Sequence, residues 1–220
     1  GASLKLHLAG VQPADPAPSS AFAETLFDQY ARTFDRSLVD KLGYCVPGLL
    51  LDAVRALVGG RLDLAIDLGC GTGLMGERLR PFADRLEGCD ISAEMLRKAA
   101  AKRIYDRLAK ADLLAMHYHG DAAALVTATD VFIYLGALET VFGVAAAGRP
   151  PRGLFPSPAK KHMEREVSAL RPPRRYAHAE AYVRRALAEA GFALLSLKDE
   201  VIRQDRGAPV AGLIIVARRS

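Results

Sequence analysis

The sequence predicts an α/β fold in which helices cover both faces of a mostly parallel sheet. From residue 62 onward, short apolar runs of the kind that form buried strands alternate with stretches of helical spacing. The first of these runs is followed by a turn with glycine at alternate positions, Gly69, Gly71 and Gly73. The chain has 220 residues, half of them hydrophobic, which suits one domain with a full core.

The N-terminal part is expected to be a tail followed by two helices. Residues 1–20 contain several prolines and serines and indicate a linker. Apolar residues then recur every four positions and predict one amphipathic helix that ends at Gly43. These residues are Phe22, Leu26, Tyr30, Phe34, Leu38 and Leu42. A second helix is predicted from Pro47 to Val58. We therefore divide the chain into a tail (1–20), a helical lid (21–60) and an α/β domain (61–220).

Strands and helices are predicted to alternate through the α/β domain. Strands are expected at 62–68, 85–89, 104–109, 130–135 and from Gly153 onward. Helices are expected through about Leu79, over 93–102 with Ser92 as N-cap, up to about Ala147, and over 179–190. Residues 192–202 and 210–217 then form a hairpin at the sheet edge around a turn at 207–209.

Composition limits the possible partners and the compartment. No stretch approaches the roughly 20 apolar residues that span a bilayer. The first residues lack the order of a signal peptide, and the three cysteines are scattered. We therefore expect free thiols in a cytoplasmic protein without membrane contact. The net charge is +5, and basic residues gather in 149–185. This segment lacks the interleaved aromatics that stack on bases, so nucleic-acid binding is not expected and a solvated surface is.

Acidic residues follow three successive predicted strands, and a further one, Asp130, begins the fourth. Ligands of open parallel sheets bind outside the carboxyl ends of the strands. Asp67 and the glycine turn follow the first strand, where backbone N–H groups can approach a ligand closely. Asp90 follows the second strand and suits a carboxylate that binds ribose hydroxyls, and Asp112 follows the third, near an adenine amino group. Asp130 and Tyr134 bracket the fourth predicted strand.

A dinucleotide is the rival ligand, because residues 71–76 fit the pattern G-x-G-x-x-G. Asp67 helps to decide between the two. A pyrophosphate is repelled by a carboxylate at the base of its turn, whereas an ammonium group is attracted. A charge-assisted contact is roughly twice as strong as a neutral hydrogen bond. Asp67 therefore favours a ligand that carries an amino-acid group.

Two segments, Asp67-Leu68-Gly69-Cys70-Gly71-Thr72-Gly73 and Gly88-Cys89-Asp90-Ile91-Ser92, resemble the first two motifs of class I methyltransferases that depend on S-adenosylmethionine (SAM). The chain looks especially like the small-molecule group that includes ubiquinone-biosynthesis C-methyltransferases. Residues 26–31 with Phe34 and Asp35, 130–136 and 175–182 are similar to a bacterial branch often described as methyltransferases with tetratricopeptide repeats, although no such repeat is present. The similarity covers most of the chain from residue 22.

The resemblance implies a Rossmann-like, seven-stranded sheet in the order 3-2-1-4-5-7-6, with SAM as cofactor and S-adenosylhomocysteine as product. Asp67 and the Gly69–Gly73 turn would hold the methionine part, Asp90 the ribose, and Asp112 with Leu113 the adenine. Ile91 and Met95 would flank the adenosine, and Tyr30 would reach over the sulfonium from the lid. The expected cofactor-binding residues are thus Tyr30, Asp67, Leu68, Gly69, Cys70, Gly71, Thr72, Gly73, Asp90, Ile91, Met95, Asp112, Leu113 and Asp130.

The fifth strand departs from the family pattern. The family has glycines followed by an apolar run, whereas residues 150–158 contain four prolines, and proline removes ladder donors from an interior strand. We therefore expect 156–173 to be disordered, remodelled or part of a substrate lid.

The expected reaction is methyl transfer to a small-molecule acceptor. A sulfonium methyl is already activated, so the acceptor must mainly be held in line and away from water. Candidates for a general base are His178, Tyr30, Tyr134 and Tyr176. His117 and His119 have no third ligand in view, so no metal is expected, and Cys70 suits packing rather than nucleophilic attack. The chain has no asparagine, and so lacks the asparagine-proline-proline-aromatic motif of enzymes that methylate amino groups of DNA and glutamine.

Two other functions stay open on the sequence. One is an NAD(P)-dependent oxidoreductase, which the pattern at 71–76 allows. The other is a non-catalytic binding module that has kept a methyltransferase fold and holds a partner through the basic segment 149–185.

Overall fold

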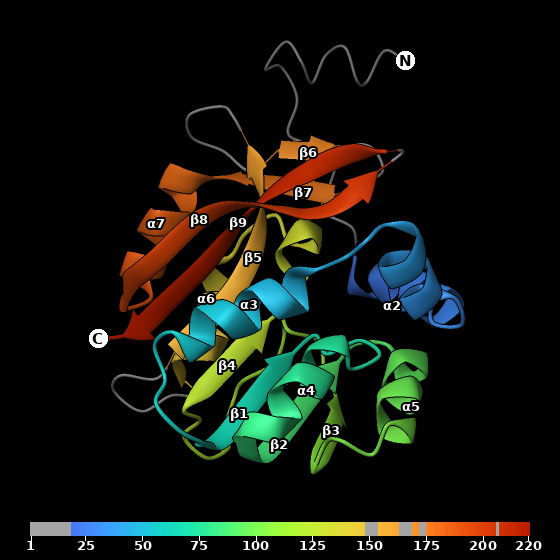
Figure 1. Ribbon diagram of the computed structural model, residues 1–220, viewed down its shortest axis with the longest axis horizontal. Coiled ribbons are helices and arrows are strands. Elements are labelled where there is room, and N and C mark those ends of the chain that lie inside the picture. The colour runs from blue at the N-terminus through green and yellow to red at the C-terminus, as the bar shows by residue number, and fades with distance from the viewer. Residues whose placement is uncertain (1–18, 148–153, 163–168, 172–174, 206) are drawn as a thin grey trace.

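The computed structural model describes residues 19–147, 154–162, 169–171, 175–205 and 207–220, which form one twisted sheet with helices on both faces (Figure 1). The predicted α/β fold with a mostly parallel sheet is therefore confirmed. All but the last two residues of the predicted tail, 1–20, lie outside the described residues, as does much of the basic segment 149–185. No helix among the described residues is both long and apolar enough to cross a bilayer.

The centre of the sheet is β1 (Leu62–Leu68), which pairs in parallel with β2 (Ala83–Asp90) on one side and β4 (Leu125–Ala128) on the other. Beyond β2 lies β3 (Arg107–Lys110), and beyond β4 lies β5 (Leu154–His162), both parallel to their neighbours. The antiparallel hairpin of β8 (Phe192–Asp205) and β9 (Ala208–Arg219) joins β5 through β9.

Two further strands were not predicted. The short strands β6 (Ala169–Arg171) and β7 (Arg175–Ala179) pair with each other, and β7 pairs with the end of β5. Among the described residues the sheet thus has nine strands rather than the expected seven.

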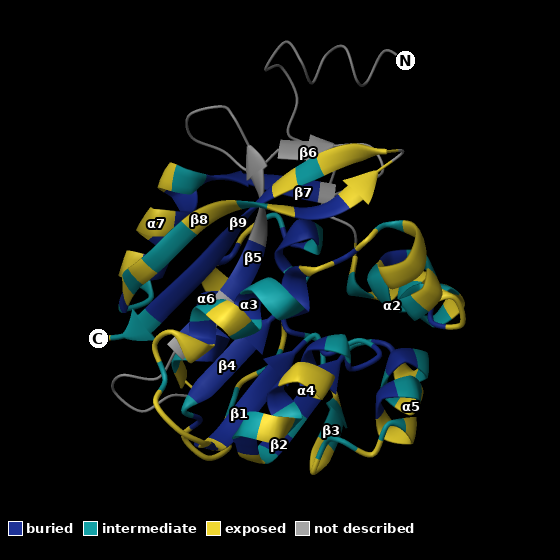
Figure 2. Ribbon diagram, viewed as in Figure 1, coloured by how far each residue is buried: buried dark blue, intermediate teal, exposed yellow. Residues whose placement is uncertain are grey.

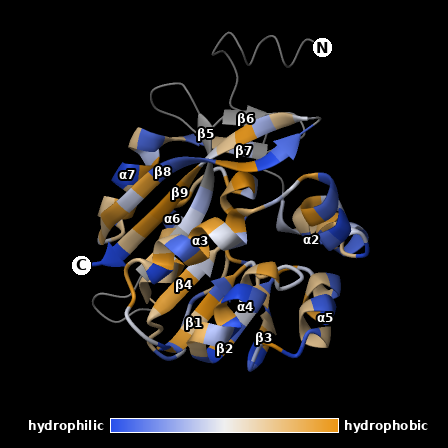
Figure 3. Ribbon diagram, in the orientation of Figure 1, coloured by the Kyte–Doolittle hydropathy of each residue, from blue (hydrophilic) through white to orange (hydrophobic). Residues whose placement is uncertain are grey.

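The helices bury two separate cores against the sheet. On one face, α6 (Glu139–Ala147) and α7 (Glu180–Glu189) pack against apolar side chains that include Ile66 of β1. On the other face, α3 (Val46–Arg55) and α4 (Leu74–Leu79) pack against side chains that include Ala65. Figure 2 shows the central strands buried between these layers, and Figure 3 shows that the same strands are hydrophobic, whereas α4 and α7 carry polar residues.

The prediction of one long N-terminal helix from the four-residue spacing is wrong. Helix α2 covers only Ser20–Tyr30, and a π-helix follows over Arg36–Lys41 before Gly43 adopts a φ of 56°. A spacing of four drifts by about 40° per step around a helix of 3.6 residues per turn, so one straight helix cannot keep the stripe on one face. The break lets Leu38 become buried, while α2 itself has no buried residue. The second predicted helix forms as α3, but it ends at Arg55.

The fourth strand lies earlier in the chain than predicted. It covers 125–128, and the predicted strand 130–135 is instead a loop with a single 3-10 turn over Phe132–Tyr134. Asp130 has a φ of 57°, a left-handed conformation that ends the strand before this apolar run. Phe132 and Ile133 are nevertheless buried, so an apolar run of this length predicted burial but not its secondary structure.

The prolines of the fifth strand do not prevent it from forming. Strand β5 pairs with β9 over seven residues but with β4 at only one, Leu154. Pro156 and Pro158 stand two residues apart, so their missing donors leave the same edge of the strand, and we assign this edge to β4. The Ser157 hydroxyl donates to the carbonyl of Ala128 in β4 at 2.6 Å and restores one bond between the two strands.

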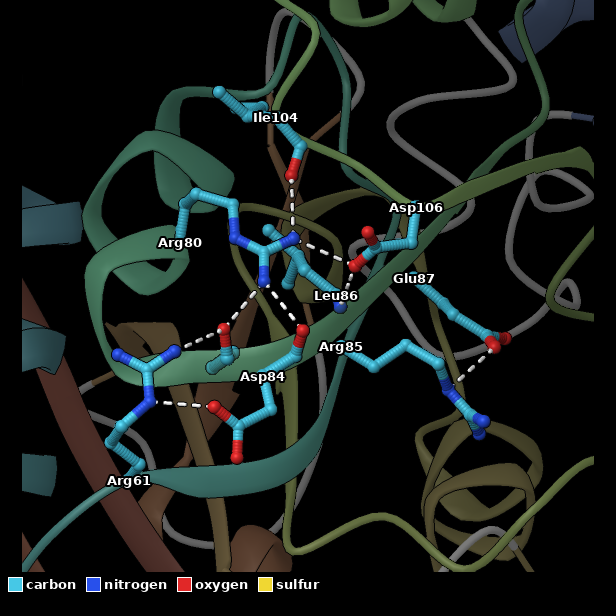
Figure 4. A network of polar contacts seen from close by, with 9 residues as sticks. Arg61, Arg80, Asp84, Arg85, Leu86, Glu87, Ile104 and Asp106 are labelled. Carbon is cyan, nitrogen blue, oxygen red and sulfur yellow. Dashed lines mark hydrogen bonds and ion pairs between the residues drawn. The ribbon is translucent and has the colours of Figure 1, made fainter.

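Arginines fasten β2 at its start, opposite the carboxyl ends of the strands. The Arg80 guanidinium donates to the carbonyls of Ala83 and Ile104 and to the carboxylate of Asp106, which also accepts from the backbone N–H of Leu86 at 2.7 Å (Figure 4). This network joins the end of α4 to the segment that enters β3. The remaining predicted elements, α4, α5 (Ala93–Ala101), α6, α7 and the hairpin, lie within a few residues of their expected positions.

Candidate functional site

A pocket opens at the carboxyl ends of β1, β2 and β4, beside α2 and α5 (Figure 1). Ten of the predicted residues line it: Tyr30, Gly69, Gly71, Asp90, Ile91, Met95, Asp112, Leu113, Asp130 and Tyr134. A smaller cavity shares part of this wall and is lined by three more, Asp67, Cys70 and Thr72. Leu68 is buried in β1 and Gly73 is the N-cap of α4, and neither lines these cavities.

The glycine turn brings its backbone to the pocket wall. Gly69 has a φ of 65°, and a Cβ on it would lie 2.5 Å from Val131 Cγ2, so any other residue would be strained and would have to displace the Val131 side chain. The N–H of Gly71 donates to Asp90 Oδ2 at 2.9 Å. The turn after β1 is therefore fixed directly to the end of β2.

Asp90 is held in one orientation by backbone donors. Its Oδ2 atom accepts from Gly71 and its Oδ1 atom accepts from the N–H of Ser92 at 2.8 Å. Burial raises the pKa of Asp90, and these backbone bonds oppose the rise. A carboxylate has about four acceptor positions, so each oxygen can still accept a hydrogen bond from a ligand in the pocket.

Asp67 differs from the simple expectation of a carboxylate that faces the ligand. It is fully buried, its Oδ2 atom accepts from the Tyr105 hydroxyl at 2.8 Å, and its Oδ1 atom accepts from Thr127 Oγ1 at 2.9 Å. Burial raises the pKa of Asp67 to about 6, against the effect of these two bonds. Direct contact between Asp67 and an amino group stays a prediction.

Tyr105 supports this carboxylate and was not identified from the sequence. Its ring fills the space beside three glycines, because a Cβ at Gly76 or Gly88 would lie 2.2 Å or 2.8 Å from it and one at Gly73 would lie 3.1 Å away. The third glycine of the G-x-G-x-x-G pattern therefore makes room for Tyr105. The signal for this residue was the unexplained Gly76 and Gly88, but the sequence did not show which side chain they accommodate.

The acids after the third and fourth strands also lie at the pocket. Asp112 Oδ1 accepts from the N–H of Leu114 at 2.9 Å, so Asp112 caps a turn as well as lining the wall. Asp130 is hydrogen-bonded to the hydroxyl of Tyr44, which is buried. Burial raises the pKa of Tyr44, and the Asp130 charge raises it further.

Helix α2 and the segment that follows it are each fastened to the strand ends through an acid. Asp28 Oδ1 accepts from Ser92 Oγ at 2.5 Å and from the N–H of Glu94 at 3.2 Å, at the start of α5. These bonds lower the pKa of Asp28. Asp35 accepts a hydrogen bond from the hydroxyl of Thr72 in the glycine turn. The N-terminal segment therefore closes one side of the pocket.

The candidate catalytic residues separate into two groups. Tyr30 and Tyr134 line the pocket, and their rings pack edge-on against Phe34 and Phe27 respectively. Among the described residues, His178 and Tyr176 line neither the pocket nor the smaller cavity beside it. His178 is fully buried in β7, where its Nε2 atom lies 2.9 Å from the carbonyl oxygen of Phe132. It therefore belongs to the core behind the pocket.

Two of the smaller predictions can be placed in the structure. His117 and His119 line a separate cavity beside β2 and β3, and the described residues contain no group of three or more metal-ligating side chains. Cys70 is buried, and burial raises the pKa of its thiol, which disfavours a thiolate nucleophile.

Several pocket residues were missed because no local motif marks them. Phe27, Phe34 and Leu38 come from the N-terminal segment, where the pattern predicted an amphipathic helix without assigning these side chains to a pocket. Arg203 comes from β8, far along the sequence, and lines the same pocket.

Residues 65–148 match the model of a family described as a methyltransferase domain. No curated protein sequence matches the chain. A SAM-dependent methyltransferase from Mesorhizobium loti is 21% identical over 76% of this chain and 96% of its own, with a TM-score of 0.61. Magnesium protoporphyrin IX methyltransferase from Synechocystis PCC 6803, solved with bound S-adenosylhomocysteine, is 20% identical over 91% of this chain and 99% of its own, with a TM-score of 0.69.

The same fold also occurs in a protein whose name gives a reaction other than methyl transfer. The [4+2]-cyclase SpnF is 16% identical over 94% of this chain and 99% of its own, with a TM-score of 0.75. At these identities the likeness establishes the fold. Residues 65–148 are therefore similar to a methyltransferase domain, and the described residues share the fold of solved SAM-dependent methyltransferases.

Proposed function

We propose that this chain transfers the methyl group of SAM to a small-molecule acceptor bound in the pocket beside α2. The observation that carries the proposal is the arrangement of Gly71, Asp90 and Asp112 at three neighbouring strand ends around one largely apolar pocket. In this proposal the N-terminal segment 21–60 acts as a lid on a cofactor-binding domain, 61–220. Strands β9 and β8 take the places of the seventh and sixth strands in the order 3-2-1-4-5-7-6.

The residues of the pocket fit the parts of SAM. The remaining acceptor capacity of Asp90 suits the ribose hydroxyls, and Asp112 beside Leu113 suits the adenine. Ile91 and Met95 offer apolar surface for the adenosine. The smaller cavity beside Asp67 suits the amino-acid part, which carries a cationic group. We assign SAM rather than a dinucleotide because a buried carboxylate at the base of the turn disfavours a pyrophosphate.

The bound cofactor supplies a methyl group that is already activated as a sulfonium. The chain's own residues then have to orient the acceptor and exclude water. Phe27, Phe34 and Leu38 form an apolar wall on the α2 side that suits this task. Tyr30 and Tyr134 are the candidate residues that reach the pocket, and we propose that one of them hydrogen-bonds the acceptor atom.

Calorimetric titration tests the cofactor assignment. SAM and S-adenosylhomocysteine should both bind, and Asp90→Ala should abolish the binding because the ribose loses its acceptor. Asp121→Ala, which removes an exposed acid elsewhere, should bind both ligands as the unchanged protein does. Tighter binding of NADH or NADPH than of SAM would instead support an oxidoreductase.

Turnover separates catalysis from binding alone. SAM with a labelled methyl group should pass its label to a component of a metabolite extract, and the label should stay in SAM when Asp90→Ala is used. Binding of SAM without any transfer would favour a non-catalytic module or a reaction other than methylation. The finer resemblance to the ubiquinone-type and repeat-associated branches stays a prediction.

A further inference from the structure

Arg203 is a buried cation that faces the pocket without a full set of partners. The residue is 7% exposed and lines the pocket wall. Its Nε atom is fully enclosed and has no hydrogen-bond partner. Buried polar groups in proteins are nearly always hydrogen-bonded, and a buried guanidinium without a partner is costly. Such a group at a pocket wall is therefore placed to meet an anionic ligand.

The backbone holds Arg203 in this position. The pairing of β8 with β9 shifts between Val201 and Arg203, so Ile202 forms a bulge, a feature that re-aims neighbouring side chains. The segment before α3 clamps the bulge, because Cys45 N–H donates to the Ile202 carbonyl at 3.3 Å and Gln204 N–H donates to the Leu42 carbonyl at 2.6 Å. The guanidinium thus projects from a fixed stretch of backbone.

Arg203 differs in charge from the other ionisable residues that line the pocket. Of the described residues that line the pocket, Arg203 is the sole cation, whereas Asp90, Asp112 and Asp130 are acidic. Among these acids, Asp130 is already hydrogen-bonded to the hydroxyl of Tyr44. An anionic acceptor would be repelled by these acids unless a cation stood at its own end of the pocket. The remaining wall is apolar and aromatic and suits the uncharged body of such an acceptor.

We propose that Arg203 binds a carboxylate of the methyl acceptor, so that the acceptor is an apolar or aromatic acid. This inference rests on the proposed function, since it places the acceptor beside a bound cofactor. The acceptor is favoured over the carboxylate of SAM as the source of the anion. The cavity assigned to the amino-acid part of SAM is lined by Asp67 and the glycine turn and does not include Arg203. Arginine presents a planar fork of donors that matches a carboxylate.

Benzoate and its neutral counterpart benzamide test the proposal by calorimetry, with saturating S-adenosylhomocysteine present. Benzoate should bind about tenfold or more tightly than benzamide, as a charged hydrogen bond predicts. Arg203→Gln should remove this preference, and Arg203→Lys should keep part of it because the charge remains without the fork. Lys198→Gln, which removes an exposed cation from the same strand, should keep the full preference. Circular dichroism of each variant verifies its fold.

Equal affinity for the two probes, no binding of benzoate, or an unchanged preference in Arg203→Gln would each overturn the proposal. A further arm identifies the source of the carboxylate. If Arg203→Gln weakens S-adenosylhomocysteine but not 5′-methylthioadenosine, which lacks the amino acid, then Arg203 binds the cofactor and the acceptor assignment is lost. Binding of S-adenosylhomocysteine is measured separately, and benzoate is also titrated without it. Failure of the cofactor assignment is therefore distinct from failure of the Arg203 assignment.

Discussion

At the scale of single residues, Asp67 links stability to pH. Its pKa in the folded chain is about 6, whereas an aspartate in an unfolded chain titrates near 4. Between these two pKa values, Asp67 holds a proton in the folded protein that it has lost in the unfolded chain. The free energy of unfolding therefore decreases as pH rises through this window. The loss is complete above about pH 6 and amounts to about 3 kcal/mol at most.

We expect Asp67→Asn to remove this decrease, because the amide does not titrate. Urea unfolding from pH 4 to pH 7.5 measures the free energy of unfolding of the unchanged protein and of Asp67→Asn. The difference between the two values cancels the contributions of other acids. Asp63→Asn, at an exposed position of the same strand, provides the matched control. A difference that does not change over this range would contradict the raised pKa.

The Tyr105 hydroxyl should tune the binding of SAM through Asp67. The ionised carboxylate attracts the ammonium group, so SAM affinity should rise as pH increases through about 6. The bond from Tyr105 lowers the pKa of Asp67, and its loss in Tyr105→Phe should move the rise to higher pH while the ring still fills its space. Titrations of SAM at several pH values measure the midpoint. Tyr118→Phe, which lies outside the pocket, should leave the midpoint unchanged.

At the scale of elements, the docking of α2 depends in part on the ionised carboxylate of Asp28. Asp28 bonds the start of α5 and has a lowered pKa, so its contribution is present above about pH 4 and is lost as pH falls through the folded value. We expect Asp28→Ala to increase hydrogen exchange in residues 20–30 several-fold and to weaken SAM binding. Asp40→Ala, an exposed acid in the following π-helix, should change neither. Unaltered exchange in Asp28→Ala would show that other contacts, among them the ion pair of Glu24 with Lys110 at 2.6 Å, hold α2 without Asp28.

The elements that the sequence predicted well are those in which local signals and packing agree. Strand β1 has an apolar run with glycine beyond it, and Ser92 caps α5 through the N–H of Met95 at 3.1 Å. The errors arose where tertiary contacts decide the outcome. The run 130–135 is apolar because it packs beneath the pocket, and a left-handed Asp130 turns it away from the sheet. Such a backbone conformation has no signal in a single sequence.

At the scale of the whole molecule, the site could be predicted in part. The glycine turn, Asp90 and Asp112 were found because each follows its strand directly, and a parallel sheet places all strand ends at one edge. Tyr105 and Arg203 were missed because chain topology alone brings them there. Arg203 reaches the pocket through the antiparallel hairpin and its bulge, neither of which fixes a side-chain direction from sequence. Motifs therefore identified the pocket wall that we propose for the cofactor, while the wall that we propose for the acceptor required the structure.

The two cores should unfold as one cooperative unit because they share β1 as a common wall. Leu50 of α3 and Leu187 of α7 are both buried, on opposite faces of the sheet. Replacing either with alanine should cost about 2–5 kcal/mol and lower the Tm by about 5–15 °C. Far-ultraviolet and tyrosine circular dichroism should report the same Tm in each variant.

S-adenosylhomocysteine at a hundred times its Kd should raise the free energy of unfolding by about 2.7 kcal/mol, and the Tm by roughly 5–10 °C, in Leu187→Ala as in the unchanged protein. Two separate transitions in either variant would show that the faces are independent, and binding at one edge of the sheet would then stabilise only one of them.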